Sequence, residues 1–234
     1  LIFTVEHCNF ELGKTMTKRQ MLSDISKVFD PLGWLVPVAL KLKLYMQASW
    51  LQSQEWDAPL PDDIVASFRS WRTTLPLLKT IKVPRFVGSK VIQLHAFCNA
   101  SQLSYAACIY ARSVSAQGVV TVSLLVAKSK VAPIKQLSIP RLELCGMLLG
   151  SALVKAVIRA LKELDIVATA VYGWTDSTIA LAWIADTPRV WNTVVANRVS
   201  QTQDVMEVEC WHHVGTAENS ADLGTRGLEP GQLE

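Results

Sequence analysis

The sequence predicts an α/β fold, in which a mixed sheet is flanked by helices, after a first segment that is mostly helical. Three strand-like runs separated by polar or glycine-containing turns begin at Val91, as in an antiparallel meander. A long run with apolar residues at helical spacing follows them. Shorter strand-like and helix-like runs then alternate, which implies crossover connections and helices packed on the faces of the sheet.

The first segment is predicted to contain one strand and three helices. The strand ends near Gly13, because Phe3 and Val5 alternate with polar neighbours. One helix follows Thr17 and stops at the FDPLG turn, and two more are expected over residues 37–54 and 61–75. The next stretch combines two prolines, a glycine and several basic residues. We therefore expect a boundary near residue 88 and two domains, residues 1–88 and 89–234.

The second segment is predicted to contain five strands, over residues 91–98, 104–113, 119–129, 168–175 and 207–214. The long helix begins after Ser138, with Pro140 in its first turn, and ends near Leu164. Shorter helices or turns are expected over residues 176–186, 190–205 and 218–227. Large aromatic residues in these apolar runs are interpreted as core residues rather than stacking platforms: Trp174, Trp183 and Trp191. The long helix is expected to pack against two tyrosines, Tyr105 and Tyr110.

Composition restricts the function only weakly. The net charge of +3 gives a mild bias toward polyanions and does not by itself indicate nucleic-acid binding. The five cysteines lack zinc spacing, so buried, reduced thiols in an intracellular protein are expected. The chain begins without Met, and we expect an excised fragment with no signal peptide and no membrane-spanning segment.

Three acidic residues lie at the edges of the predicted elements. Glu143 is at the start of the long helix, Asp176 follows the fourth strand, and Asp222 follows the fifth. They can converge at one end of the sheet, where carboxylates near one another require a cation and suit Mg²⁺. Two such ions about 3.5–4 Å apart would support phosphodiester cleavage. Spacing alone leaves a second interpretation open, in which each acid is solvated or caps a helix, as Asp176 can do.

Six sequence blocks resemble a known family. In order, they are similar to the reverse transcriptase and ribonuclease H region of BEL/Pao-type retrotransposon polyproteins: TKRQMLSDISKVFDPLGWLVPV, FCNASQLSYAACIY, AKSKVAPIKQLSIPRLELCG, YGWTDSTIALAWI, VANRVSQ and ENSADLGTRG. The resemblance implies that residues 1–88 are the end of the polymerase, with its last palm strand and thumb or connection helices. It implies that residues 89–234 are a ribonuclease H-like domain, with a five-stranded mixed sheet flanked by helices.

The resemblance also implies an activity and its partners. The expected reaction is Mg²⁺-dependent cleavage of the RNA strand of an RNA/DNA hybrid during reverse transcription, with a two-metal site in which Mn²⁺ can substitute. The expected partners are that hybrid and the upstream reverse transcriptase palm of the same polyprotein. Related elements reverse-transcribe in cytoplasmic particles, so a cytoplasmic location is expected.

One expected catalytic residue is replaced. By resemblance, the family's carboxylates lie in the motifs D-A-S, R-L-E-L, T-D-S and A-D, and the last three are present as Glu143, Asp176 and Asp222. In FCNAS, Asn99 takes the place of the first aspartate, the usual bridging metal ligand. An amide brings no negative charge and cannot bridge two Mg²⁺ ions as a carboxylate does. We therefore expect weaker metal occupancy and a strongly impaired nuclease.

Other residues are candidates for supporting roles. Ribonucleases H often carry a mobile histidine that helps product leave, and His213 is the candidate here. The alternative is that one of His212 and His213 ends the fifth strand and the other packs under Trp211. Asn219 either contacts substrate or caps the terminal helix, and Thr175 and Ser177 either contact phosphate or cap. The bases that either track the nucleic-acid backbone or only aid solubility are Lys128, Lys130, Lys135, Arg141, Arg198 and Arg226.

There are two alternatives to an active nuclease. A decayed copy would keep the fold and bind nucleic acid, or serve only as a structural module, without cleavage; Asn99 favours this alternative. A peptidase is the other, because this region is filed in some catalogues as a Pao retrotransposon peptidase. The sequence contains neither Asp-Thr-Gly nor Asp-Ser-Gly, which an aspartic peptidase needs, and no G-x-S-x-G elbow. We expect the peptidase label to be nominal.

Overall fold

The computed structural model describes residues 15–52, 55–84 and 87–233, which form two compact units. The first unit comprises residues 1–31, 35–83 and 227–234, and the second comprises residues 32–34 and 84–226. The predicted strand that ends near Gly13 lies outside the described residues. The units divide between Val83 and Pro84, a few residues before the expected boundary, and the last eight residues belong to the first unit.

The described part of the first unit is helical, and its three α-helices lie where the sequence predicts helices, whereas its two 3-10 helices were not predicted. They are α1 (Lys18–Ser26), α2 (Val36–Leu51), α3 (Asp62–Thr74) and the 3-10 helices η1 (Leu75–Thr80) and η5 (Pro230–Gln232). Thr17 caps α1 in a reciprocal capping box with Gln20. Phe68 and Trp71 are fully buried on α3, and Tyr45 of α2 meets Phe68 edge to face. These aromatic contacts give the unit a core of its own.

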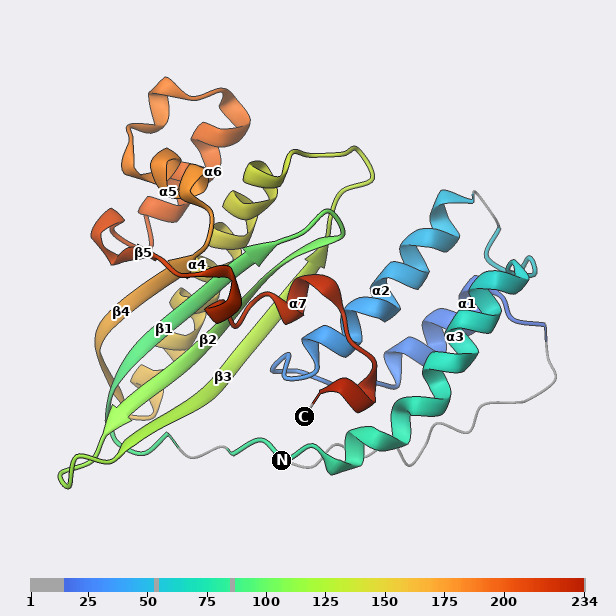
Figure 1. Ribbon diagram of the computed structural model, residues 1–234, viewed down its shortest axis with the longest axis horizontal. Helices are drawn as coiled ribbons and strands as arrows, with labels where there is room; N and C mark the ends of the chain where they lie inside the picture. Colours follow the sequence, from blue (N-terminus) through green and yellow to red (C-terminus); the bar gives the residue numbers. More distant parts are fainter. Residues whose placement is uncertain (1–14, 53–54, 85–86, 234) are drawn as a thin grey trace. The chain divides into compact units, whose positions relative to one another are not determined.

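The second unit is built on a five-stranded mixed sheet with the strand order β3-β2-β1-β4-β5 (Figure 1). The predicted meander is present, because β1 (Val91–Ala100), β2 (Ser104–Val114) and β3 (Val120–Val131) pair antiparallel. Strand β4 (Val167–Thr175) runs parallel to β1, and β5 (Trp211–His213) runs parallel to β4. The mixed sheet with flanking helices confirms the predicted fold class.

Helix α4 (Ile139–Glu163) forms the crossover from β3 to β4 and covers one face of the sheet (Figure 1). The residues of β1 alternate, and Ile92, Leu94, Ala96 and Cys98 are buried in the core on the α4 side. The connection between β4 and β5 contains α5 (Thr178–Ala185), η2 (Pro188–Val190), α6 (Thr193–Gln203) and η3 (Val208–Cys210). After β5 come η4 (Thr216–Glu218) and α7 (Leu223–Arg226).

Helix α4 is, among the described residues, the one helix long and apolar enough to cross a membrane by length and composition. Its buried residues, which include Leu144 and Met147, pack into the core of the second unit. A core helix of this kind meets the same criteria, so the helix is accounted for by the fold.

Several predicted details were wrong. The expected strand over residues 207–214 is a 3-10 turn followed by a strand of three residues. The helix expected to open at Asp176 begins at Thr178, because the Ser177 hydroxyl accepts a hydrogen bond from the Ala180 amide and caps it. Tyr110 does not pack against α4. It lies half-buried on the opposite face of the sheet among other aromatic rings, which include the half-buried Trp174.

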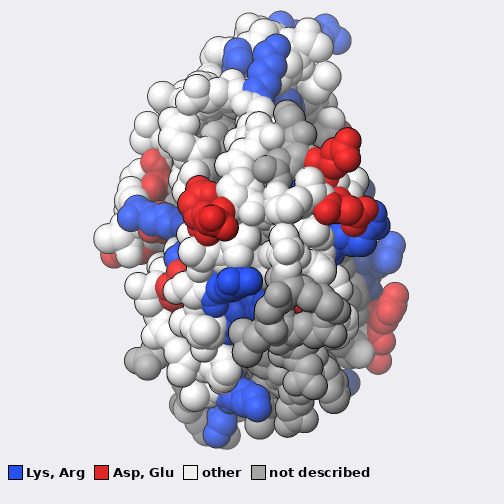
Figure 2. Space-filling model, turned by 90° about the vertical axis from the view of Figure 1, so that its right-hand side faces the viewer, with Lys and Arg blue, Asp and Glu red and all other residues white. Residues whose placement is uncertain are grey.

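The charges on the face in Figure 2 are mixed. Lys and Arg side chains alternate there with Asp and Glu among uncharged residues, and neither sign forms a continuous patch. The small net charge of +3 is therefore not gathered into a basic surface on this face.

Candidate functional site

The site forms where two parallel neighbouring strands end at the same edge of the sheet. Asn99 is the penultimate residue of β1, and Asp176 follows the last residue of β4. Strands β1 and β4 pair in parallel with Phe97 opposite Trp174, so the two residues lie at the same end. The carboxyl ends of such strands are the usual place for polar sites in mixed sheets.

Helix α4 brings Glu143 to this edge. Pro140 in the first turn suits the start of the helix, and Glu143 follows one turn later, only 5% exposed. Burial and the nearby charges of Asp176 and Asp222 raise the pKa of Glu143 from 4.5 to about 8, against a hydrogen bond from the Ala100 backbone. Asp176 and Asp222 are thus near enough to Glu143 to disfavour its charged form, and the assignment of the three carboxylates to one catalytic site stays a prediction.

Asn99 makes a hydrogen bond to a carboxylate. Its Nδ2 donates to Asp222 Oδ1 at 2.9 Å, and its Oδ1 accepts from the Ala100 amide at 2.7 Å. An aspartate here would place a second negative charge against Asp222, whereas the amide supplies a donor. Asp222 also accepts from Arg226 Nε, which lies 2.9 Å from its carboxylate oxygens. Asp222 is therefore held by one neutral and one cationic donor.

Asn219 makes hydrogen bonds that the sequence did not reveal. Its buried Nδ2 lies 3.0 Å from the Cys98 carbonyl and 3.4 Å from Asp176 Oδ1, and its Oδ1 accepts from the Ala221 amide. The side chain thus connects the segment after β5 to β1 and to Asp176. The predicted substrate contact and helix cap stay predictions, and a buried amide that joins three segments leaves no periodic signal in a sequence.

The side chains of His212 and His213 lie in different surroundings. His213 is exposed at the end of β5, where it pairs with Thr175 of β4. His212 is half-buried and its ring lies 5.2 Å from that of Trp174, rather than under Trp211. Ser177 caps α5 and Thr175 Oγ1 accepts from the Ser177 amide, so both hydroxyls make local hydrogen bonds.

The predicted basic residues differ in their surroundings. Lys128 and Lys130 are exposed on β3, Lys135 is exposed in the loop before α4, and Arg141 is half-buried in the first turn of α4. Arg198 is engaged within the unit, because its Nε donates to Cys145 Sγ at 3.2 Å and its Nη1 donates to the Val194 carbonyl at 2.8 Å.

The carboxylate oxygens of Glu143, Asp176 and Asp222 are suitable ligands for a hard cation, although the three groups do not surround one metal position. Among the described residues, no group of three or more His, Cys, Asp and Glu side chains lies close enough together to hold a metal ion. The buried Glu143 Oε2, however, has no hydrogen-bond partner in the described part of the chain. An orphaned carboxylate oxygen beside two further carboxylates is the kind of donor set that Mg²⁺ prefers.

Comparison with solved structures gives low identities. The N-terminal RNase H domain of a Mycobacterium tuberculosis protein, solved as a fusion with maltose-binding protein, is 14% identical with a TM-score of 0.36, over 56% of this chain and 87% of that chain. RNase H1 from the halophilic archaeon Halobacterium salinarum is 10% identical with a TM-score of 0.33, over 55% and 89%. No curated protein matches the chain.

A third structure resembles the chain over a longer stretch. A foamy viral protease-reverse transcriptase, dRH, in complex with double-stranded DNA, is 13% identical with a TM-score of 0.53. The match covers 87% of this chain and 32% of the viral chain, so this chain spans about a third of that protein's length. At this identity the likeness concerns the fold alone.

A family model covers most of the chain. The model described as a Pao retrotransposon-like RNaseH-like domain matches residues 17–177 of the 234, a range that contains Asn99, Glu143 and Asp176. Its description names a ribonuclease H-like domain and no peptidase. The chain therefore belongs to the family of Pao retrotransposon-like RNaseH-like domains.

Proposed function

We propose that the second unit is the ribonuclease H domain of a BEL/Pao retrotransposon polyprotein, and that Asn99 strongly impairs its metal-dependent cleavage of the RNA strand of RNA/DNA hybrids. The observation that carries the proposal is a set of hydrogen bonds at one edge of the sheet, beside the buried Glu143, in which Asn99 contacts Asp222 and Asn219 contacts Asp176. Family membership supports the reaction class, and the contacts of Asn99 support the impairment.

The side chains at this edge of the sheet have separate tasks in this proposal. Glu143, Asp176 and Asp222 would hold Mg²⁺, which when bound supplies an activated water and neutralises the leaving oxygen. Glu143 presents a buried oxygen that lacks a protein partner, so it is available to a cation. Asn219 fixes the Asp176 carboxylate through its amide, and Arg226 fixes Asp222. His213, exposed at the end of β5, would help the cleaved product leave.

Asn99 impairs the reaction through charge and through its hydrogen bond. The site has three carboxylates where the family pattern has four, so its attraction for a divalent ion is weaker. The Asn99 amide also donates to the Asp222 oxygen that faces it, and a cation would have to displace that bond. Residues that act as one unit lose orders of magnitude in rate when one is removed.

Binding of the hybrid needs cationic contacts near the site. We propose that Lys128, Lys130 and Arg141 contact phosphates, because the two lysines are exposed on β3 and Arg141 is in the same helical turn region as Glu143. Arg198, Arg226 and Asn219 are engaged with protein groups and would contribute by shaping the site. The A-form geometry and 2′-hydroxyls of the hybrid would define the substrate.

The first unit has a separate proposed role. By its resemblance, it would be the end of the reverse transcriptase and would help position the hybrid when the upstream palm is present. A cytoplasmic, particle-associated location belongs to the same proposal.

A second function is favoured by the same asparagine. Because the Asn99 amide satisfies Asp222 without a cation, the domain can keep its fold as a nucleic-acid-binding or structural remnant with no cleavage. The two functions differ in whether hybrid is cut or only bound in the presence of Mg²⁺.

The test is cleavage of a labelled RNA/DNA hybrid in Mg²⁺ and in Mn²⁺. We compare the unaltered chain with Asn99→Asp, and use Asn99→Asp combined with Asp176→Asn as the matched inactive control. Asn99→Asp is expected to raise the cleavage rate by at least a hundredfold, since it restores a member of the catalytic set. The same variant should gain more thermal stability from Mg²⁺ than the unaltered chain, because a ligand stabilises the state that binds it.

Three results would count against the proposal. Equal cleavage by the unaltered chain and Asn99→Asp would show that Asn99 does not impair the enzyme. Binding of hybrid without cleavage by any variant would leave the remnant as the function, and absence of both binding and cleavage would remove the nuclease assignment.

A further inference from the structure

The sheet face opposite α4 carries a row of aromatic rings. Six half-buried rings from four strands contact one another in sequence across this face: Tyr110 of β2, His95 and Phe97 of β1, Tyr172 and Trp174 of β4, and His212 of β5. The rings of His95 and Trp174 are nearly parallel, 8° apart with centroids 6.1 Å apart. None of these six residues serves the carboxylate site or the α4 core.

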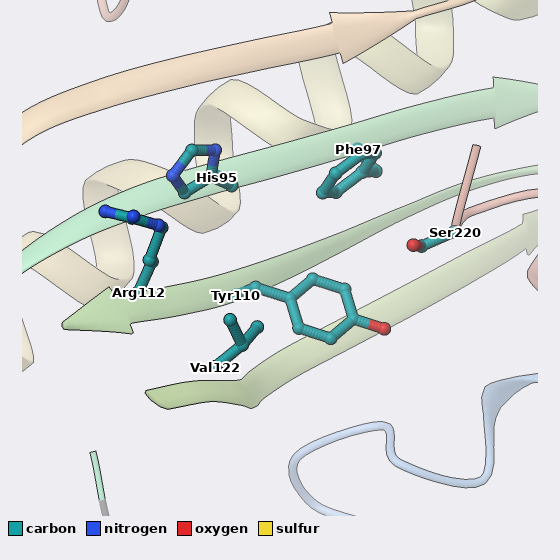
Figure 3. Close-up of a pocket in the computed structure, with 6 residues that line it drawn as sticks. All are labelled: His95, Phe97, Tyr110, Arg112, Val122 and Ser220. Atoms are coloured by element: carbon teal, nitrogen blue, oxygen red, sulfur yellow. The ribbon is translucent and has the colours of Figure 1, made fainter. Parts of the chain in front are cut away.

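A pocket lies at the β1–β2 end of this row. It has a volume of about 280 Å³ and is lined by His95, Phe97, Tyr110, Arg112, Val122 and Ser220 (Figure 3). Phe97 and Tyr110 meet edge to face with centroids 5.9 Å apart, so each ring presents a face that the other does not cover. Figure 3 shows the Arg112 guanidinium extending toward His95, with Ser220 beside Phe97 at the opposite end.

Two side chains of the pocket, His95 and Arg112, have donor groups to spare, while the Tyr110 hydroxyl and Ser220 hydrogen-bond each other. His95 Nδ1 accepts from Trp174 Nε1 at 3.2 Å, so Nε2 carries the ring proton, and Nε2 is buried with no partner among the described residues. Arg112 Nη1 donates to Gln93 at 3.0 Å, and the guanidinium has further N–H groups. Arg112 is the one charged residue among the six that line the pocket, and no acid balances it there. A ligand with acceptor atoms and negative charge complements this lining.

We propose that the pocket and the adjoining aromatic row bind single-stranded nucleic acid, with an unpaired base stacked on Phe97 or Tyr110 and a neighbouring phosphate bound by Arg112. Aromatic side chains on an open sheet are sequence-tolerant platforms for bases, and a cation beside them follows the backbone. Bases in a duplex or hybrid are stacked on each other, so their faces are not available to the row. The inference does not depend on the proposed function, because none of its residues holds a carboxylate of the cleavage site.

The test is the binding of a fluorescein-labelled oligothymidylate, measured by anisotropy in EDTA at low salt. Phe97→Leu keeps apolar volume but removes a stacking face, and we expect it to weaken binding about tenfold, within the range that base stacking supplies. Arg112→Gln should weaken binding and reduce its dependence on salt. Arg159→Gln, which removes an exposed charge on α4, serves as the matched control and should bind within about twofold of the unaltered chain.

Folding and location need separate checks. Far-ultraviolet circular dichroism and thermal melting exclude misfolded variants, and an oligonucleotide containing 5-bromouracil should crosslink to peptides that contain Phe97 or Tyr110. Asp176→Asn should bind the single strand as the unaltered chain does.

Three outcomes would overturn the proposal. The first is equal binding of single strand and duplex, with no effect of Phe97→Leu. The second is loss of binding in Asp176→Asn but not in the pocket variants. The third is failure to bind any oligonucleotide while a peptide binds this face of the sheet. The second outcome would locate the strand at the carboxylate site. The third would make the face a protein-docking surface.

Discussion

Among single residues, Glu143 has the most perturbed environment of the carboxylate site. Its pKa is raised from 4.5 to about 8, chiefly by burial and then by the charge of Asp176. The folded state therefore holds this proton over a pH range in which the unfolded chain has released it. The contribution of Glu143 to stability is undiminished below about pH 4.5 and declines as the pH rises to about 8, with a slope of at most about 1.4 kcal/mol per pH unit.

Glu143→Gln should remove this pH dependence. The variant has no proton to lose at this position, so we expect it to be more stable than the unaltered chain at pH 8, by about 1–3 kcal/mol. At pH 5 the two should be similar. Urea denaturation in EDTA at pH 5, 6, 7 and 8 measures the difference. A difference that stays constant with pH would show that Glu143 is ionised in the folded protein throughout.

The packing of α4 on β1 determines how close the carboxylates come. Gly150 lies against β1, and a Cβ added there would be 2.4 Å from Cys98 Sγ. Cys98 is fully buried, so its sulfur has little freedom to move. Gly150→Ala should therefore destabilise the protein by about 1–3 kcal/mol, despite the gain in helix propensity.

A double-mutant cycle separates this clash from other effects. In the Cys98→Ala background the sulfur is gone, so Gly150→Ala should cost less there and can stabilise the helix. The coupling energy is measured by urea denaturation of the four proteins. Equal costs of Gly150→Ala in both backgrounds would mean that the contact with Cys98 does not limit the approach of α4.

At the scale of elements, the sequence predicted the type and order of most helices and strands, but not which face of the sheet is covered. Tyr110 of β2 stands between Ile109 and Ala111, and all three are apolar enough to be buried, so alternation alone does not say which set faces α4. Tyr110 was assigned to the wrong side for this reason. The short strand β5 was overestimated because a 3-10 turn precedes Trp211 in an apolar run.

The candidate site was predicted in part. The positions of Glu143, Asp176 and Asp222 at element ends follow from the order of elements, so their convergence was expected. The contacts of Asn99 and Asn219 depend on side chains more than a hundred residues apart in sequence. No local pattern records such contacts.

The molecule as a whole consists of two compact units, each with its own buried residues. Phe68 is fully buried in the first unit, and Leu94 is fully buried in the second. Separate cores favour unfolding in more than one step. We therefore expect two transitions in differential scanning calorimetry. Phe68→Ala should lower the midpoint temperature of one and Leu94→Ala that of the other, each through the loss of about 2–5 kcal/mol in free energy of unfolding that is typical of a core truncation. In Asn99→Asp, addition of Mg²⁺ should raise only the transition that Leu94→Ala lowers, because a ligand stabilises the unit that binds it. A single transition that both truncations lower equally would mean that the units unfold together, and the effect of Mg²⁺ would then report on the stability of the whole chain.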